Sequence, residues 1–254
     1  MQAQLEGQTA LVTGATGPIG RAVTLRLAEA GADLVVNCRH RVTEAEALAQ
    51  QVRSLGRRAV AVQADVTHEA DVQRLVSAAQ EQLGHLDILI NVVGHFLRKP
   101  LAETLAGEWE EMLQSNVSSV FYTCKAVLPE MRRRGHGRIV NLGLAGIDAG
   151  HGFVQIGAHA VAKTALLALT RSLAKQEAPY GITVNMVSPG FVRGVDMPDA
   201  DVEALARRIP AGRLASPEEV ATAVVFLSSE EASDITGTVL EVAGGWGREV
   251  PPHP

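Results

Sequence analysis

The sequence predicts an α/β protein with a doubly wound, seven-stranded parallel sheet and helices on both faces of the sheet. The first observation is that short β-rich runs alternate with longer helical patterns from end to end, which is typical of βαβ units. The second is composition, because 46% of the 254 residues are hydrophobic and 4% are aromatic, which indicates a core of aliphatic strands and Ala-rich helices. A chain of this length commonly forms one α/β domain, so we expect residues 1–254 to be a single domain.

The expected strands are short apolar runs rich in β-branched residues, as in a parallel sheet that is covered on both faces. In chain order they are Thr9–Val12, Asp33–Cys38, Ala59–Gln63, Ile88–Val92, Arg138–Leu142, Thr183–Ser188 and Val239–Val242.

The expected helices show the 3.6-residue period and recognisable ends. Between the first two strands, Ile19, Ala22, Val23, Leu27 and Ala30 recur at helical spacing, and Gly31 follows where a C-terminal cap is expected. Two later helices have capping-box spacing at their starts. These are Thr43 with Glu46, and Ser216 with Glu219, where Pro217 takes the first helical position.

Charge and cysteine content exclude several classes of function. The formal net charge of −5 is spread along the chain, so we expect no nucleic-acid partner, and we interpret Arg132–Arg134 as a solvated helix end. No apolar stretch approaches the length of a membrane span, and no signal peptide precedes the first strand, which predicts a cytoplasmic protein without membrane contact. Cys38 and Cys124 lack the spacing of a disulfide or zinc framework and are expected to be buried thiols. We expect no metal site.

A glycine-rich turn follows the first strand and opens the first helix. Its sequence, from Thr13 to Gly20, reads Thr-Gly-Ala-Thr-Gly-Pro-Ile-Gly. Glycines keep side chains out of such a turn, so that backbone N–H groups and the positive end of the helix dipole can face a pyrophosphate. A merely tight structural turn is the alternative, but the strand–turn–helix context favours a Rossmann-type dinucleotide-binding fold.

At this turn the chain resembles the short-chain dehydrogenase/reductase family, whose usual motif is Thr-Gly-x-x-x-Gly-x-Gly. Pro18 stands in the place of the middle glycine, and Gly17 supplies a glycine one residue earlier, as in the longer extended branch of the family. Proline has no N–H and cannot donate to a phosphate, but its fixed φ suits the start of a helix. We therefore expect nucleotide binding to survive this departure.

Further family motifs follow in order over nearly the whole chain, and the nearest subgroup is similar to the 3-oxoacyl-acyl-carrier-protein reductases. The resemblance implies that Asp65 and Val66 contact adenine, and that the stretch from Asn91 to Gly94 is a variant of the family's Asn-Asn-Ala-Gly. Matches to later motifs are Asn116 in Ser-Asn-Val, Pro189–Gly190, Gly212–Arg213, Ser216–Glu219 and Ile235–Gly237.

The end of the second expected strand indicates which dinucleotide binds. An acidic residue about 20 positions beyond the glycine turn would bind the ribose 2′-hydroxyl, and none is present. Arg39 and Arg41 stand there instead, and guanidinium groups can pair with a 2′-phosphate. Solvated loop charges are the alternative interpretation, but the pattern favours NADP(H). The cofactor-binding set is then Gly14, Thr16, Gly17, Ile19, Gly20, Arg39, Arg41, Asp65, Val66, Asn91, Gly94, Lys163, Pro189, Gly190 and Val192.

The resemblance also implies a catalytic Ser, Tyr and Lys, of which this chain keeps one. Lys163 lies in the expected helix, where the family's lysine holds the nicotinamide ribose and lowers the tyrosine pKa. Four residues earlier stands His159 in place of the tyrosine, and Gly143–Leu144 stands where the family has its serine. The threonine that the family has four residues beyond Pro189–Gly190 is Gly194 here.

The candidate catalytic residues are therefore Asn116, His159 and Lys163. A nearby ammonium disfavours imidazolium, so His159 is expected to be neutral at pH 7 and better placed to accept a proton than to give one. Asp148 and His151 lie in the preceding loop, where they could orient His159 or relay a proton.

Two functional hypotheses remain open. The first is a divergent NADP(H)-dependent oxidoreductase that acts on a small-molecule carbonyl or alcohol, in which Asn116 holds a water relay. The second is a non-catalytic NADP(H)-binding sensor or partner subunit that has lost the acid–base pair. Fold alone cannot separate them. We also expect a homotetramer or homodimer, formed by apolar helix faces, and a mobile substrate loop around residues 191–210.

Overall fold

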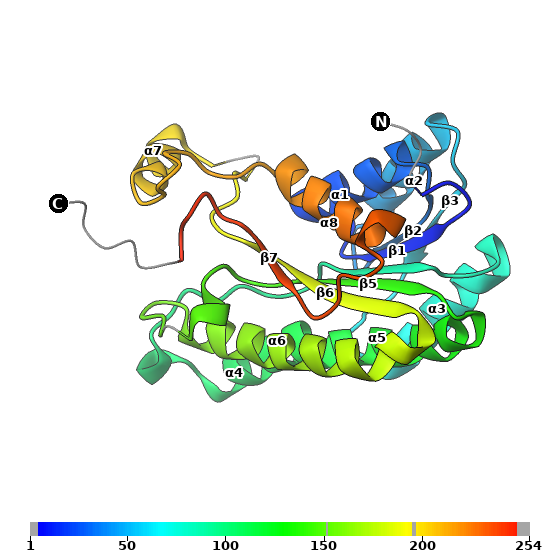
Figure 1. The fold of residues 1–254 in the computed structure, drawn as a ribbon. Helices are drawn as coiled ribbons and strands as arrows, with labels where there is room; N and C mark the ends of the chain where they lie inside the picture. Colours follow the sequence, from blue (N-terminus) through cyan, green and yellow to red (C-terminus); the bar gives the residue numbers. More distant parts are fainter. Residues whose placement is uncertain (1–4, 151, 195–196, 248–254) are drawn as a thin grey trace.

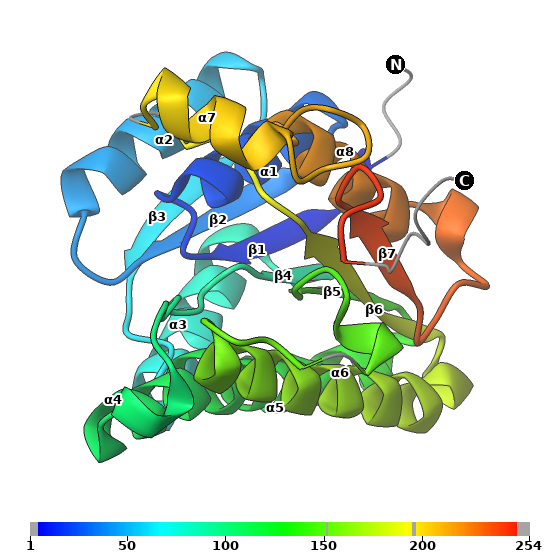
Figure 2. The same cartoon turned by 90° about the vertical axis from the view of Figure 1, so that its left-hand side faces the viewer.

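The computed structural model describes residues 5–150, 152–194 and 197–247, and its strands form one parallel sheet. In chain order the strands are β1 (Thr9–Thr13), β2 (Asp33–Cys38), β3 (Ala59–Gln63), β4 (Ile88–Asn91), β5 (Gly137–Leu142), β6 (Ile182–Pro189) and β7 (Val239–Val242). They lie in the order β3-β2-β1-β4-β5-β6-β7, which the labels of Figure 2 follow across the sheet. All seven expected strands are confirmed, with ends that differ from the expected ones by at most one residue.

The helices cover both faces of the sheet. They are α1 (Pro18–Glu29), α2 (Val42–Ser54), α3 (Glu69–Leu83), α4 (Ala106–Leu113), α5 (Ser119–Arg134), α6 (Gly157–Glu177), α7 (Asp199–Ala206) and α8 (Pro217–Ser228). One face packs against α1, α2 and α8, and the other packs against α3, α5 and α6 (Figures 1 and 2). This is the predicted doubly wound architecture.

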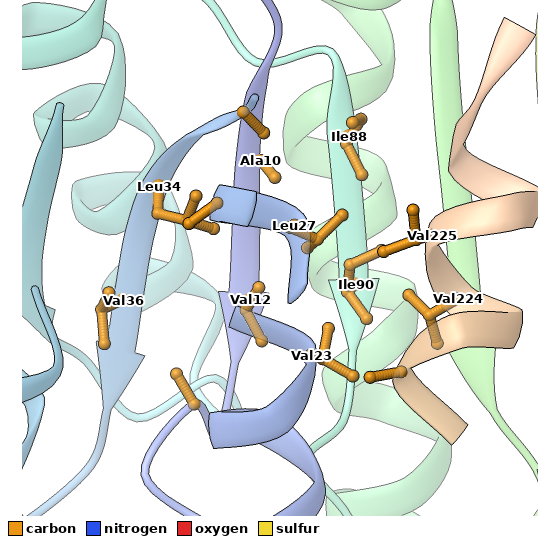
Figure 3. Packing of buried hydrophobic residues seen from close by; sticks show 14 of the residues in the cluster. Ala10, Val12, Val23, Leu27, Leu34, Val36, Ile88, Ile90, Val224 and Val225 are labelled. Carbon is orange, nitrogen blue, oxygen red and sulfur yellow. The ribbon is translucent and has the colours of Figure 1, made fainter. Parts of the chain in front are cut away.

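Alternate residues of each strand point to opposite faces, so each strand contributes to two cores. On the face of α1 and α8, Val12 of β1 and Ile90 of β4 lie among Val23, Leu27 and Val224 (Figure 3). Leu11 and Leu89, the neighbours in sequence of Val12 and Ile90, belong to the core under α3, α5 and α6. Burial on both faces explains why the strands are continuous apolar runs in the sequence.

One of the two expected capping boxes is confirmed. The Ser216 hydroxyl accepts from the Glu219 N–H at 3.2 Å, the Glu219 carboxylate accepts from the Ser216 N–H at 2.9 Å, and Pro217 begins α8. The expected box at Thr43 is wrong, because α2 already begins at Val42 and no side chain caps it. The Ala45 N–H bonds to the carbonyl of Arg41, so Thr43 lies inside the first turn.

The interpretation of Arg132–Arg134 as a solvated helix end is also wrong in part. The three arginines do form the last turn of α5, where cations complement the helix dipole. However, Arg132 bonds through two nitrogens, each at 2.6 Å, to the buried carboxylate of Glu177 on α6. Arg134 bonds at 2.6 Å to Asp87, another buried carboxylate, just before β4. These pairs therefore join α5 to its neighbours.

The chain order of the strands reverses between β1 and β4, and this reversal positions the site. In open parallel sheets, a crevice opens at the carboxyl ends of the strands at such a point. The segments that follow β1, β2, β4 and β6 all meet there. The segment after β6, expected to be a mobile loop, contains α7, whereas its mobility stays a prediction.

Candidate active site

A cleft of about 550 Å³ opens at the carboxyl ends of β1, β2 and β4. Eleven of the fifteen predicted cofactor residues line it: Gly14, Thr16, Gly17, Ile19, Gly20, Arg39, Arg41, Asp65, Val66, Gly94 and Val192. The other four predicted residues, Asn91, Lys163, Pro189 and Gly190, lie outside its lining.

The glycine turn depends on one left-handed residue and on one close approach of backbone. Gly14 adopts φ +62°, a left-handed conformation that favours glycine. A Cβ on Gly20 would lie 2.3 Å from the carbonyl oxygen of Gly14, so only glycine lets α1 start this close to β1. The N–H groups of Ile19 and Gly20 belong to the first turn of α1, where no intrahelical acceptor exists. The turn can therefore present free donors to a phosphate.

Arg39 and Arg41 lie on the loop after β2 and line the cleft. Arg39 Nε lies 2.6 Å from Nε2 of His40 and 3.6 Å from the carboxylate of Asp65. Arg41 pairs with Glu44 at 3.2 Å, and both guanidinium groups are about half exposed. The two groups are held at the rim by weak surface contacts that a phosphate could replace.

Three of the predicted cofactor residues that do not line the cleft contact other parts of the protein. The Asn91 amide bonds to the Asn141 side chain at 2.9 Å and accepts from Thr123 at 2.8 Å, so its side chain points into the core and not into the cleft. The carbonyl of Pro189 accepts from the Ala145 N–H. A Cβ on Gly190 would lie 2.9 Å from Cβ of Ala243. The Asn91 side chain thus has a structural role, whereas a contact of Asn91 with the cofactor stays a prediction.

Two of the three candidate catalytic residues, Asn116 and Lys163, come together at Gly94, after β4. A Cβ on Gly94 would lie 2.3 Å from Oδ1 of Asn116 and 3.3 Å from Nζ of Lys163. Asn116 sits in a π-helical turn, Gln114–Ser118, between α4 and α5. Its Nδ2 donates to the carbonyl of His95, whereas Oδ1 is buried without a hydrogen-bond partner among the described residues. An unpaired buried acceptor beside an ammonium is a position where a ligand or a water would be stabilised.

His159 and Lys163 lie four residues apart on α6, on one face of the helix. Nζ of Lys163 donates to the carbonyl of Leu142 at 2.7 Å, and burial lowers the pKa of this lysine to about 8. Burial, and then the nearby Lys163 charge, lower the pKa of His159 to about 4. The expectation of a neutral imidazole at pH 7 is therefore supported by its surroundings.

Of the two expected helpers of His159, only Asp148 lies within the described residues. Asp148 pairs with Arg171 of α6, so it does not orient or relay for His159. His151 lies outside the described residues. Leu144, in the place of the family's serine, is buried in the apolar core under α6.

The cleft also has lining residues that sequence reasoning missed, among them Asn37, Ser115 and Arg193. The Asn37 amide bonds to the carbonyls of Val62 and Ala64 and accepts from the Gly14 N–H at 3.4 Å, which holds the glycine turn on the end of β2. Asn37 could have been predicted as a site residue, because it is a polar residue at the end of an apolar strand. Ser115 carries no such signal, because only the π-helical turn brings it to the cleft.

A protein-family model described as enoyl-(acyl carrier protein) reductase matches residues 14–247. The chain is a short-chain dehydrogenase/reductase. It is 37% identical to the 3-oxoacyl-(acyl-carrier-protein) reductase of Escherichia coli (strain K12), over 94% of this chain and 97% of that protein. It is also 37% identical to a Bacillus subtilis (strain 168) protein named as an oxidoreductase, YtkK, over 93% of this chain and 95% of that protein.

Solved structures of the family superpose closely. A gluconate 5-dehydrogenase from Burkholderia cenocepacia J2315, in complex with NADP and tartrate, is 32% identical, with a TM-score of 0.89 over 98% of each chain. No described helix of this short-chain dehydrogenase/reductase is long and apolar enough to cross a membrane. Within the described ranges, no three His, Cys, Asp or Glu side chains are arranged to hold a metal ion.

Proposed function

We propose that this chain is a divergent NADP(H)-dependent oxidoreductase that acts on a carbonyl or hydroxyl group of a small molecule. The observation that carries the proposal is that a cleft lined by the glycine turn and two arginines leads to His95 and Gly94, beside the buried Lys163 and His159. The family membership supports oxidoreductase chemistry, and the NADP complex of the solved relative supports the cofactor.

The residues divide into binding and proton-handling roles. The first turn of α1 would hold the pyrophosphate, Arg39 and Arg41 the 2′-phosphate, and Lys163 the nicotinamide ribose. The bound nicotinamide supplies the group that exchanges a hydride with the substrate carbon. His159 would move the proton at the substrate oxygen, and Asn116 with its unpaired Oδ1 would hold a water between Lys163 and the interior.

A two-part assay tests this function. Binding of NADPH and NADP⁺ is titrated by fluorescence, and turnover is then screened with carbonyl and alcohol substrates in both directions. Tight binding with turnover supports the oxidoreductase. Tight binding without turnover of any compound favours the alternative, a non-catalytic sensor or partner subunit, because loss of the Ser and Tyr pair removes the usual proton donor. Absence of NADP(H) binding contradicts both.

The preference for NADP(H) is expected to depend on Arg39 and Arg41. Changing both to alanine should weaken NADPH binding about ten- to hundredfold, because charge-assisted hydrogen bonds to a phosphate are lost, while NADH affinity should change little. Fluorescence titration of both cofactors measures this. Arg26→Ala, at the far end of α1 and paired with Glu29, is the control and should leave both affinities unchanged. Tighter binding of NADH than of NADPH by the unmodified protein contradicts the assignment.

We also propose that the chain forms a homotetramer or a homodimer through the outer faces of α5 and α6. Phe121 of α5 and Val161 of α6 are large apolar side chains that stay exposed in the single chain. Light scattering should give a multiple of the chain mass at micromolar concentration, and Phe121→Glu with Val161→Glu should reduce it. Leu55→Glu, at the exposed end of α2, is the matched control. A monomeric unmodified protein would refute the proposal.

The free cysteines support the expected cytoplasmic location. Cys38 and Cys124 are both buried and unpaired. Burial raises the pKa of the Cys124 thiol to about 12, so this thiol is unreactive.

A further inference from the structure

The hydrogen bonding of His159 determines which ring nitrogen carries its hydrogen. Nδ1 lies 3.0 Å from the carbonyl oxygen of His95. A carbonyl oxygen can only accept, so Nδ1 of the neutral ring must be the donor and Nε2 must hold the lone pair. Nε2 has no hydrogen-bond partner among the described residues and is not sealed from solvent. It therefore remains available to a substrate hydroxyl.

The carbonyl of His95 is itself held firmly. It also accepts from Nδ2 of Asn116 at 3.0 Å, and the His95 N–H donates to the Ser115 hydroxyl at 3.2 Å. Both partners lie in the π-helical turn between α4 and α5. The tautomer of His159 is thus set by a backbone group that two side chains of another element fix in place.

The charged groups around His159 disfavour its protonated form. From α6 it faces Lys163, whose charge repels an imidazolium ion. From the segment after β4 it faces His95, whose own ring pairs with Glu111 of α4 at 2.7 Å on the outer surface. No carboxylate among the described residues contacts the His159 ring, and its pKa of about 4 follows from burial and from Lys163.

Two apolar side chains, Phe96 and Leu101, lie beside His159 and the start of its helix. The Phe96 ring meets the imidazole edge-on, with 5.1 Å between centroids, and Phe96 is 63% exposed. Leu101 packs on Gly157, two residues before His159, so closely that a Cβ there would lie 2.6 Å from its Cγ. Such surroundings suit a substrate that carries its hydroxyl on an uncharged, apolar group.

We propose, building on the oxidoreductase function above, that Nε2 of His159 accepts the hydroxyl proton of an uncharged secondary alcohol, in a tautomer fixed by the His95 carbonyl. The O–H bond breaks and its proton goes to Nε2. The C–H bond breaks with its electron pair, which the oxidised nicotinamide takes up, so that the alcohol becomes a ketone and NADP⁺ becomes NADPH. The imidazolium ion then releases its proton to solvent.

The pH dependence of the two directions reveals the proton carrier. Oxidation releases one proton overall, so the ratio of kcat/KM for oxidation to that for reduction must change tenfold per pH unit. If the proton carrier is neutral at the working pH, kcat/KM for oxidation does not change with pH. The whole change then falls on kcat/KM for reduction, because reduction starts from the rare imidazolium form. A tyrosine-like acid with a high pKa would show the opposite.

The test measures kcat/KM between pH 5 and pH 7.5 with 2-octanol and 1-phenylethanol plus NADP⁺, and with their ketones plus NADPH. Reduction should fall about tenfold per pH unit, and oxidation should change less than about twofold. If kcat/KM for reduction does not change with pH while kcat/KM for oxidation rises with pH, the proposal is overturned and the oxidoreductase function still holds. Turnover of 3-hydroxybutyrate in preference to the uncharged alcohols would overturn the substrate class. Tight NADPH binding without turnover of any alcohol would also overturn the proposal, whereas loss of NADPH binding would count against the oxidoreductase function itself.

Two further measurements test the proposal, and the first of them needs no substrate. Long-range ¹H–¹⁵N NMR should show the His159 ring as neutral and protonated at Nδ1 at pH 7, with its signal identified by its loss in His159→Gln. A ring protonated at Nε2 would refute the tautomer. Glutamine can still donate to the His95 carbonyl but cannot act as a base, so His159→Gln should lower oxidation about 10²–10⁴-fold with unchanged NADPH affinity. Unchanged oxidation would refute the role of Nε2.

Discussion

His159→Tyr combined with Leu144→Ser is expected to create NADPH-dependent reduction of simple β-keto esters, or to raise it by about 10²–10⁴-fold. General acid catalysis typically contributes a rate increase of this size. Lys163 is four residues beyond His159 on α6, and its Nζ donates to the carbonyl of Leu142, two residues before Leu144. The ammonium would favour the tyrosinate form and so lower the tyrosine pKa. Phe96, exposed beside His159, can move to admit the larger ring.

Three controls separate catalysis from repacking. Each single change should gain much less than the pair, since the acid and the group that orients the carbonyl act together. Adding Lys163→Met should remove the gain, because an uncharged side chain cannot lower the tyrosine pKa. Circular dichroism shows whether Leu144→Ser, which places a hydroxyl in an apolar core, still folds. A folded double variant that binds NADPH tightly and shows no new turnover would mean that the cofactor geometry has been lost.

Arg134→Met is expected to lower the free energy of unfolding by about 2–3 kcal/mol, because it leaves the Asp87 carboxylate buried with one charge-assisted hydrogen bond fewer. Asp87 also accepts from the Thr9 N–H at 2.8 Å, and so joins β1 and the start of β4 to α5. The loss therefore falls on the centre of the sheet. Calorimetry should show a fall in Tm of roughly 5–10 °C for a domain of this size.

The adjacent arginine provides the matched control. Arg133 points to solvent and pairs with Glu130 of its own helix, so Arg133→Met should leave Tm unchanged within error. If Arg133→Met and Arg134→Met lower Tm equally, the positive charge at the end of α5 stabilises the protein and the buried Arg134–Asp87 pair does not.

The sequence determined the sheet, the glycine turn and the absence of the family's serine and tyrosine. Strands that are buried on both faces must be apolar throughout, and backbone contacts within the turn require glycine, so both features leave local signals. The register of Lys163 with His159 is likewise local, because helical spacing places them on one face. Eleven of the predicted cofactor residues line the cleft for the same reason, since they follow strands whose carboxyl ends must meet.

Tertiary structure alone decided what surrounds each polar group. The Asn91 amide turns into the core because Asn141 and Thr123, distant in sequence, satisfy it there. Asp148 forms an ion pair with Arg171, and Arg134 forms one with Asp87. The tautomer of His159 depends on a main-chain carbonyl, a group that every residue has and that no sequence pattern marks. Pairings of this kind depend on the relative placement of whole elements, which residue order along the chain does not encode locally.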